Sequence, residues 1–490
     1  MKAKIIVFLV MTLLISTALQ TVGTRSNNNP NDPDFSKQWY LDNTGQTGGT
    51  IDADIDAPEA WDIETGNPDI VIAIIDSGVD YTHPDLADNM WINEDEIPGN
   101  SIDDDENGYV DDVRGWDWYN DDNDPLDDLG HGTSVTGIFG AVGNNNIGIT
   151  GVCWNCKIMP LKYIGSVLGE PFNLEDLAIA IEYAADNGAN VISISSESYL
   201  QNTNLKDAVD YAYGKGIVLV CPAGNGDTSD KTYPAGYENV IAVAGTDHND
   251  SRMNYYDYHY PTWIISNYGP WVDVAAPGQQ IYTTTPTYHV TLNDYGFSQN
   301  YEYGTGTSAS APIVSGIAGL LLSKEPDLTP EQIKLLICNN VDPYDSGYDL
   351  GSGRVNAYKA LLASNPPTAP GIDGETNGDV GTTYEYNFTS TDSNTDNLSE
   401  YIVNWGDGSN ETITGPFPSG SPATGSHKWT TKGDYTITAK AKDVNGIVGP
   451  EGTLTVTMPC SYNIPLHWFW GRLFQRFPTA FPLLRHLMGY

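Results

Sequence analysis

The feature that most constrains the fold of this chain is a series of short apolar runs separated by helical patterns. The runs are DIVIAII (69–75), ANVISIS (189–195), GIVLVC (216–221), NVIAVA (239–244) and WVDVAA (271–276). Continuous apolar runs of this length are typical of strands that are buried on both faces. Between them, LEDLAIAIEYAADNG and LKDAVDYAYGKG place apolar residues at helical spacing and end in glycine. This alternation predicts an α/β fold with a doubly wound, mostly parallel sheet.

Three polar residues occur where such a sheet places its chemistry, at or after the carboxyl ends of strands. Asp76 directly follows the first apolar run, in DSGVDYTHPDL, and His131 begins the small-residue pattern GHGTSVTGIFGAVG. Ser308 lies in GTGTSASAP (304–312), at the start of an apolar helical pattern. Each has an ordinary structural reading by itself, because aspartate is common in turns and serine caps helices.

Together the three residues supply the groups for acyl transfer by a serine. That reaction needs a hydroxyl, an imidazole that takes its proton and a carboxylate that orients the imidazole. Ser308, His131 and Asp76 provide them in this order. A donor for the oxyanion is also required, and the side-chain amide of Asn225, in CPAGNGD just after GIVLVC, is suited to that task.

The order Asp, His, Ser within DSG, GHGT and GTS, with AGN between the last two, resembles the subtilisin-like serine protease (subtilase) family. HPDL, NNNIGITGV, YPAGYENVIAVAG, SNYGPWVDVAAPG and GSGRVNAYKAL also resemble it, so the likeness covers about residues 31 to 360. It implies that Asp76 orients, His131 acts as general base and acid, Ser308 is the nucleophile and Asn225 the oxyanion donor. The implied function is an endopeptidase that hydrolyses polypeptides through an acyl-enzyme. The alternative is a catalytically silent homologue that serves as a surface binding or adhesion protein.

The resemblance also implies a substrate cleft lined by Ser195, Ser196, Glu197, Ala223 and Gly224. Here the chain departs from the family, which usually has SLGG or SWGG where this sequence reads SSES at 195–198. Glu197 adds a carboxylate, so we expect a preference for a basic side chain before the scissile bond. Two further departures are Ala309 in place of the usual Met after the nucleophile, and Ile313 in place of a common His.

Acidic residues predict calcium as the cofactor. The chain has 64 Asp plus Glu against 22 Lys plus Arg, a formal charge of −42, which disfavours nucleic acid and anionic membrane surfaces and favours cations. The stretch SIDDDENGYVDDVRG is similar to an EF-hand loop without the closing Glu, and a solvated acidic loop is the alternative. Its predicted ligands are Asp103, Asp105, Asn107 and Asp111. The family resemblance implies a second calcium site, formed by side chains of Asp32, Asp85 and Asn145 and backbone oxygens of Gly143, Ile147 and Ile149.

The N-terminal segment MKAKIIVFLVMTLLISTALQ has a short basic head and an apolar run, which predicts a cleaved signal peptide over residues 1–20. A single membrane anchor is the alternative. We therefore expect a secreted, extracellular protein that acts as a monomer. Export favours disulfides among the five cysteines, and Cys153 and Cys156 in CWNC form either a local disulfide or two small core residues.

Composition changes after the peptidase domain, which we place at residues 31–363. SNPPTAPG predicts a linker at 364–369, and residues 370–458 alternate polar and β-prone residues as in an antiparallel sandwich. NWGDG (404–408) and HKWTTKGDYTITAKAKDVNG (427–446) resemble a PKD-type, Ig-like domain, either a substrate-binding module or a spacer. The tail, 459–490, is aromatic and basic. It is consistent with attachment to a cell surface or membrane interface, with recognition by a sorting system, or with folding back onto the acidic domains.

Overall fold

The computed structural model describes residues 29–167, 169, 172–259, 261–459, 472, 475 and 476. The predicted signal peptide, Cys460 and nearly all of the predicted tail therefore lie outside the described residues. The chain divides into two compact units, Met1–Ser364 and Asn365–Tyr490. Among the described residues, no helix is both long enough and apolar enough to cross a bilayer.

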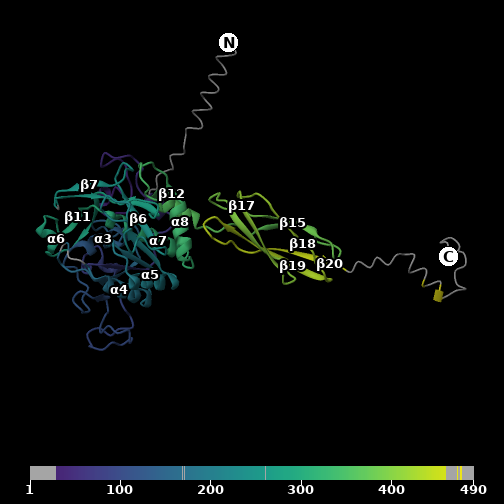
Figure 1. The fold of residues 1–490 in the computed structure, drawn as a ribbon, viewed down its shortest axis with the longest axis horizontal. Coiled ribbons are helices and arrows are strands. Elements are labelled where there is room, and N and C mark those ends of the chain that lie inside the picture. The colour runs from purple at the N-terminus through teal and green to yellow at the C-terminus, as the bar shows by residue number, and fades with distance from the viewer. Residues whose placement is uncertain are drawn as a thin grey trace, which may run out of the picture. The chain divides into compact units, whose positions relative to one another are not determined.

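A nine-stranded sheet organises the first unit (Figure 1), in the order β12-β13-β9-β6-β5-β4-β1-β3-β2. Its strands are β1 (Val71–Asp76), β2 (Trp116–Asp117), β3 (Lys157–Lys162), β4 (Val191–Ile194), β5 (Val218–Pro222), β6 (Ile241–Thr246), β9 (Val274–Pro277), β12 (Val341–Asp342) and β13 (Arg354–Val355). All neighbouring pairs are parallel except β12 and β13. The predicted fold class is confirmed. Because β1 lies between β3 and β4, the winding direction reverses there, and Asp76 ends the strand at this switch point.

Helices cover both faces of this sheet because alternate residues of each strand point to opposite sides. The helices are α2 (Ala57–Trp61), α3 (His131–Gly140), α4 (Leu174–Asp186), α5 (Thr203–Gly214), α6 (Thr291–Asp294), α7 (Thr307–Lys324), α8 (Pro330–Asn339) and α9 (Ala357–Ala363), with 3₁₀ turns η1 (Phe35–Lys37) and η2 (Ala87–Asn89). Ala73 and Ile75 of β1 form a core with α4 and α5, each of which begins at an asparagine cap. On the other face, Ser315 of α7 donates to Ser193 of β4 at 2.9 Å.

Small residues let α7 lie close to its neighbours. A Cβ on Gly316 would come 2.6 Å from Val152, and one on Gly319 would come 3.0 Å from the Cys156 sulfur. Cys153 and Cys156 form a disulfide, so the structure supports the first of the two alternatives for CWNC.

The first unit also contains two antiparallel strand pairs outside the large sheet. They are β7 (Asn254–Asp257) with β8 (Thr262–Ile265), and β10 (Ile281–Thr285) with β11 (Asn300–Gly304).

The second unit contains two antiparallel sheets, as a β-sandwich requires. One sheet has β14 (Gly371–Gly374), β15 (Tyr384–Thr389) and β18 (Ala423–His427). The other has β16 (Leu398–Asn404), β17 (Asn410–Phe417), β19 (Gly433–Asp443) and β20 (Gly452–Met458). Alternate residues of these strands are buried, and Phe388 of one sheet shares a core with Tyr401 and Trp405 of the other.

Candidate active site

Asp76 and His131 meet at the carboxyl end of β1, the strand that lies between β3 and β4 in the sheet. His131 is the first residue of α3, and its Nδ1 lies 2.7 Å from Oδ1 of Asp76. The Asp76 side chain is 1% exposed and the His131 side chain 33% exposed. Ser77 donates its backbone N–H to Oδ1 at 2.7 Å, whereas Oδ2 is buried without a hydrogen-bond partner. The pair therefore presents the other imidazole nitrogen to the surface.

A second buried carboxylate, Asp127, holds the turn after β1 and the start of α3 in place through hydrogen bonds. It accepts hydrogen bonds from the Ser77 hydroxyl at 2.9 Å and from the Gly130 and Thr133 backbones at 2.8 Å each. Ser77 in turn accepts the Gly132 N–H at 2.9 Å, so the turn after β1 and the start of α3 are joined. Burial raises the pKa of Asp127 to about 6, although these hydrogen bonds oppose the rise. Asp127 was not predicted from the sequence, where the signal that marks it is an Asp four residues before His131.

Ser308 is the second residue of α7 and lines the same cavity as His131. The N-cap residue of this helix is Gly306, so the Ser308 hydroxyl does not serve as the cap. The Ser308 carbonyl accepts the hydroxyl of Ser195 at 3.1 Å, which ties the helix start to the segment after β4.

Asn225 is held with its amide nitrogen available. Its Oδ1 accepts the backbone N–H of Thr307 at 2.9 Å and the Thr307 hydroxyl at 3.2 Å, directly before Ser308. Among the described residues none accepts a hydrogen bond from its Nδ2, so that group can donate to a ligand. The fully buried Asn267 shapes the loop, because its Nδ2 donates to the Ala223 carbonyl at 2.8 Å and its Oδ1 accepts the Gly226 N–H at 2.9 Å. Thr307 and Asn267 were not predicted to position the site, although Thr307 lies in GTS beside the nucleophile and Asn267 in the family-like stretch SNYGPWVDVAAPG.

The predicted substrate-binding segment follows β4. Ser196 bonds to the buried hydroxyl of Tyr163, so its side chain points into the protein rather than outward. Glu197 is half-buried, and its carboxylate feels the charge of His131 and a hydrogen bond from the Asn225 backbone. Burial outweighs both effects and raises the pKa of Glu197. Ala223 is buried, and Gly224 has a φ of +99°, a conformation that favours glycine.

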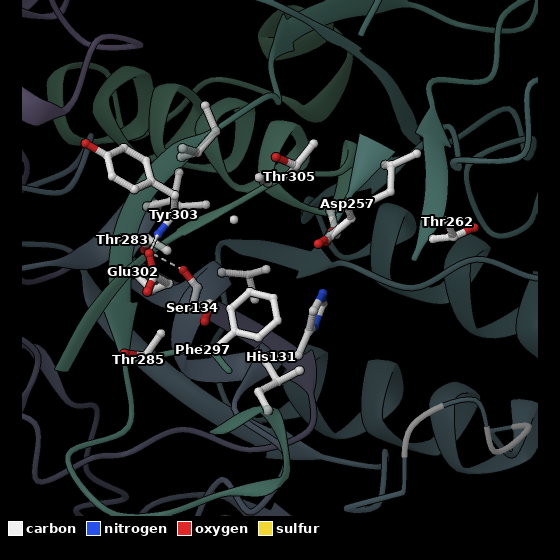
Figure 2. A pocket seen from close by; sticks show the side chains of 18 residues that line it. His131, Ser134, Asp257, Thr262, Thr283, Thr285, Phe297, Glu302, Tyr303 and Thr305 are labelled. Carbon is white, nitrogen blue, oxygen red and sulfur yellow. Dashed lines mark hydrogen bonds between the residues drawn. The ribbon is translucent and has the colours of Figure 1, made fainter. Parts of the chain in front are cut away.

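A cavity of about 270 Å³ opens beside His131 and Ser308. Figure 2 shows His131, Phe297, Thr283 and Glu302 among the side chains that surround this cavity. Most of the lining is apolar, from α3, β10 and the segment around α6: Val135, Ile138, Ile281, Leu292 and Phe297. Ala309, next to Ser308, completes the wall, and its methyl group leaves open the volume that a methionine would fill.

Comparison with known proteins agrees with this geometry. Residues 67–386, which include Asp76, His131, Asn225 and Ser308, match the profile of the Subtilase family. The chain belongs to the subtilase family. It is 37% identical to thermitase of Thermoactinomyces vulgaris over 333 residues, covering 68% of this chain and 99% of that protein. It is 38% identical to a thermophilic serine proteinase of Bacillus sp. (strain AK1) over 303 residues, covering 62% and 64% of the two chains.

A solved structure supports the fold. A protease from Pseudoalteromonas arctica PAMC 21717 superposes with a TM-score of 0.53 at 28% identity, covering 69% of this chain and 99% of that chain. This subtilase is therefore a serine endopeptidase, as the motifs predicted.

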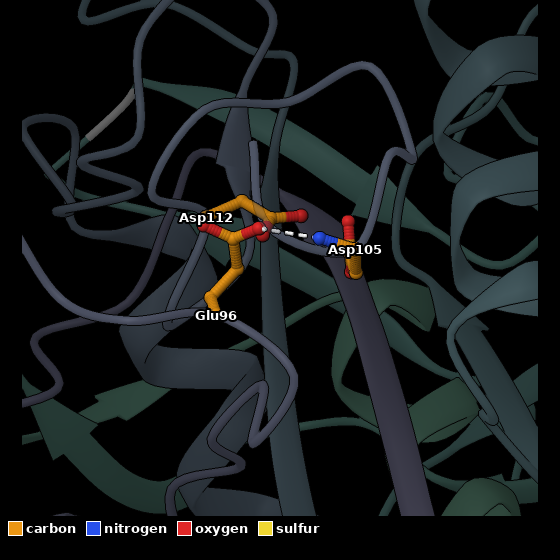
Figure 3. Close-up of side chains that lie close together, drawn as sticks. All are labelled: Glu96, Asp105 and Asp112. Atoms are coloured by element: carbon orange, nitrogen blue, oxygen red, sulfur yellow. Dashed lines mark hydrogen bonds between the residues drawn. The ribbon is translucent and has the colours of Figure 1, made fainter. Parts of the chain in front are cut away.

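The acidic loop of this subtilase brings together a set of carboxylates that differs from the predicted one. Glu96, Asp105 and Asp112 offer oxygens that all lie within 4.8 Å of one another (Figure 3). Asp105 is thus placed in the cluster, with Asn107 donating to it and to Asp112 at 3.0 and 2.9 Å. Glu96 and Asp112 were missed because they lie at the edges of the acidic run.

Asp103 and Asp111 instead stabilise turns. Asp103 accepts the backbone N–H groups of Asn107 and Gly108 at 3.1 and 2.8 Å. Asp111 accepts those of three residues, 99 to 101, at 2.8 to 3.1 Å. Their carboxylates are used by the loop backbone, which is why the predicted EF-hand pattern and the carboxylate cluster differ.

The residues of the second predicted calcium site do meet. Asn145 donates its side-chain amide to Asp85 at 2.8 Å and its backbone N–H to Asp32 at 3.1 Å. Ile149 donates its N–H to Asp85 at 2.8 Å, and Ile147 donates to Asn145 at 2.7 Å. Burial raises the pKa of Asp85 to about 6, and the Asp32 charge adds to that rise. Gly143 lies in the same segment, where a Cβ would come 2.2 Å from Trp154.

We predict that Glu197→Gln lowers the pKa of His131. Burial lowers that pKa, but the charges of Asp76, Asp127 and Glu197 outweigh it and raise the net value. Removing the Glu197 charge destabilises the imidazolium, so the pKa of His131 falls. NMR titration of the His131 ring measures it in the Ser308→Ala background.

Glu302→Gln is the matched control, since Glu302 lines the same cavity but is held by Ser298 and by the Tyr303 backbone. An equal effect of both substitutions would contradict a specific influence of Glu197.

Proposed function

We propose that this chain is a secreted, calcium-dependent endopeptidase in which Ser308 forms the acyl-enzyme. The observation that carries the proposal is the 2.7 Å contact between Asp76 Oδ1 and His131 Nδ1, on the rim of a cavity shared with Ser308. With Nδ1–H donated to Asp76, Nε2 is the nitrogen that remains free to accept a proton.

His131 then takes the proton of the Ser308 hydroxyl as the oxygen attacks the peptide carbonyl. The buried carboxylate of Asp76 stabilises the imidazolium that results. Asn225 Nδ2 donates to the developing oxyanion, because its Oδ1 is already engaged by Thr307. His131 passes the proton to the leaving amine, and water repeats the sequence to release the acid.

The cavity marks the side on which the leaving group lies. His131 protonates that group, and His131 and Ser308 both line the cavity, whereas neither Asn225 nor Glu197 is among the described residues that do so. We infer that an apolar side chain after the scissile bond enters this cavity. The residue before the scissile bond faces Glu197 on the opposite side of Ser308, where the carboxylate favours a basic side chain.

Labelling by a serine-reactive peptidyl phosphonate tests the proposal against the catalytically silent alternative. We expect the calcium-loaded chain to gain one phosphonyl group at Ser308, located by mass spectrometry, because only an activated hydroxyl reacts. Ser134→Ala is the matched control, since Ser134 lines the same cavity but donates its hydroxyl to the Gly130 carbonyl at 2.8 Å. It should label normally, and Ser308→Ala should not. A folded wild-type chain that stays unlabelled would refute the enzymatic proposal.

Two calcium sites support the folded peptidase unit in this proposal. Glu96, Asp105 and Asp112 form a compact set of oxygen ligands, and two of the three are buried. Asp32, Asp85 and Asn145 would hold the second ion, with backbone oxygens of Gly143, Ile147 and Ile149. Calcium prefers such irregular sets of oxygens, and it would relieve the repulsion among buried carboxylates.

We predict that a chelator lowers the melting temperature of the first unit by about 5 °C, because calcium binds only the folded chain. In calorimetry of the Ser308→Ala background, Glu96→Gln should reduce that difference. Asp95→Asn should leave it intact, since Asp95 is the exposed neighbour of Glu96. If the chelator has the same effect on both variants, the cluster does not bind the ion.

The remaining proposals rest on the sequence. We expect secretion through a signal peptide at residues 1–20, monomeric action on polypeptides, and no nucleic-acid partner. Residues 31–363 act as the peptidase domain, 364–369 as a linker, 370–458 as a PKD-type domain and 459–490 as a tail for surface attachment.

A further inference from the structure

Part of the cavity beside Ser308 is formed by the β7–β8 hairpin. Asp257 of β7 pairs with Thr262 of β8, and Ile264 lies two residues further along β8. Paired residues and residues two apart project from the same face of a strand pair, so these three side chains share one face of the hairpin. All three line the cavity (Figure 2). Ile264 is the apolar member of this wall.

The hairpin is held at both of its ends. At its base, the backbone N–H of Ile265 donates to the Asn225 carbonyl at 3.3 Å, which joins β8 to the loop of the oxyanion donor. At the other end, the His259 ring packs against the Phe297 ring with centroids 4.5 Å apart. Nδ1 of His259 also lies 3.1 Å from the Tyr295 carbonyl oxygen. The hairpin is therefore fixed between the oxyanion loop and the segment after α6, and His259 positions Phe297 in the cavity wall.

Two carboxylates line the cavity as well, but both already accept hydrogen bonds from the protein. Glu302 accepts the Ser298 hydroxyl at 2.7 Å and the Tyr303 N–H at 2.9 Å. Asp257 accepts the His259 N–H at 2.8 Å. Since these carboxylates have partners and most of the remaining lining is apolar, the cavity suits an apolar side chain better than a cation.

The size of the cavity favours an aromatic side chain. Its volume is about 270 Å³, whereas an apolar cavity of about 150 Å³ is enough to bind benzene. One aromatic ring therefore fits, and a small side chain such as alanine leaves most of the volume unfilled. Phe297 and Tyr303 both line the cavity, and rings attract one another in tilted or offset arrangements.

We propose that this cavity selects an aromatic residue directly after the scissile bond, with Ile264 and Phe297 as the specificity-determining residues. The proposal rests on the endopeptidase function proposed above and names the substrate class on the leaving-group side. Ile264 contributes from the hairpin and Phe297 from the segment after α6. His259 is a positioning residue, because it acts through Phe297.

Cleavage of quenched fluorescent peptides that differ only in the residue after the scissile bond tests the proposal. For the calcium-loaded wild type, kcat/KM should be at least about tenfold higher with Phe than with Ala at that position, and a Lys peptide should be no better than the Ala peptide. Phe297→Ala and Ile264→Ala should each bring the Phe-to-Ala ratio to within about threefold of one, whereas Phe297→Leu should keep part of the preference. Mass spectrometry of the products verifies the cleaved bond.

Tyr258→Ala is the matched control, because Tyr258 is an aromatic residue of the same hairpin, is 81% exposed and is not among the described residues that line the cavity. It should keep the wild-type ratio. Equal kcat/KM of the wild type on the Phe and Ala peptides would overturn the proposal, and so would fastest cleavage of the Lys peptide. If Ser308 is still labelled by the phosphonate in that case, the proposed function stands and only the specificity is wrong. A ratio that survives both Phe297→Ala and Ile264→Ala would overturn the assignment of these residues, and the wild-type ratio decides if neither variant folds.

Discussion

The hydrogen bond between Asp76 and His131 is the interaction on which the rest of the active centre depends. Its strength comes from the position of the carboxylate, which ends β1 at the switch point, is almost fully buried and has no hydrogen-bond partner at Oδ2. A histidine on the surface would not be oriented in this way. The fold therefore holds one imidazole in a single tautomer at the switch point of the sheet, where parallel strands leave room for a ligand.

Several contacts maintain that geometry, and most of them involve the backbone. Gly132 lies so close to Gly78 that a Cβ would come 2.0 Å from its carbonyl oxygen. This contact explains Gly132 of GHGT, whereas Gly78 of DSG has a φ of +95° and its own Cβ would come 2.5 Å from the Pro125 carbonyl oxygen. On the nucleophile side of the site, Thr307 connects Asn225 to the start of α7, because its N–H and its hydroxyl both donate to Asn225 Oδ1. Thr307 therefore positions Asn225, the oxyanion donor, and the next residue of α7 is the nucleophile Ser308.

The strands and the catalytic residues could be predicted because their signals are local. DIVIAII is apolar on both faces, and DSG, GHGT and GTS are short motifs in a fixed order. The positioning residues Asp127 and Asn267 act through hydrogen bonds to backbone groups that are brought near only by folding. The acidic loop likewise contains contacts that form only on folding. Asp103 and Asp111 match an EF-hand pattern but bind their own turns, and Glu96 reaches the cluster from outside the pattern.

The central claim is that Asp76 makes His131 competent as a base. The most direct measurement is kcat of Asp76→Asn on a peptide substrate, with Ser308→Ala as the baseline and circular dichroism to verify folding. The amide retains the shape of the carboxylate but favours the wrong tautomer and cannot stabilise the imidazolium. The account predicts a fall in kcat of about 10⁴-fold with little change in KM. A folded Asp76→Asn enzyme with kcat within about tenfold of the wild type would contradict it.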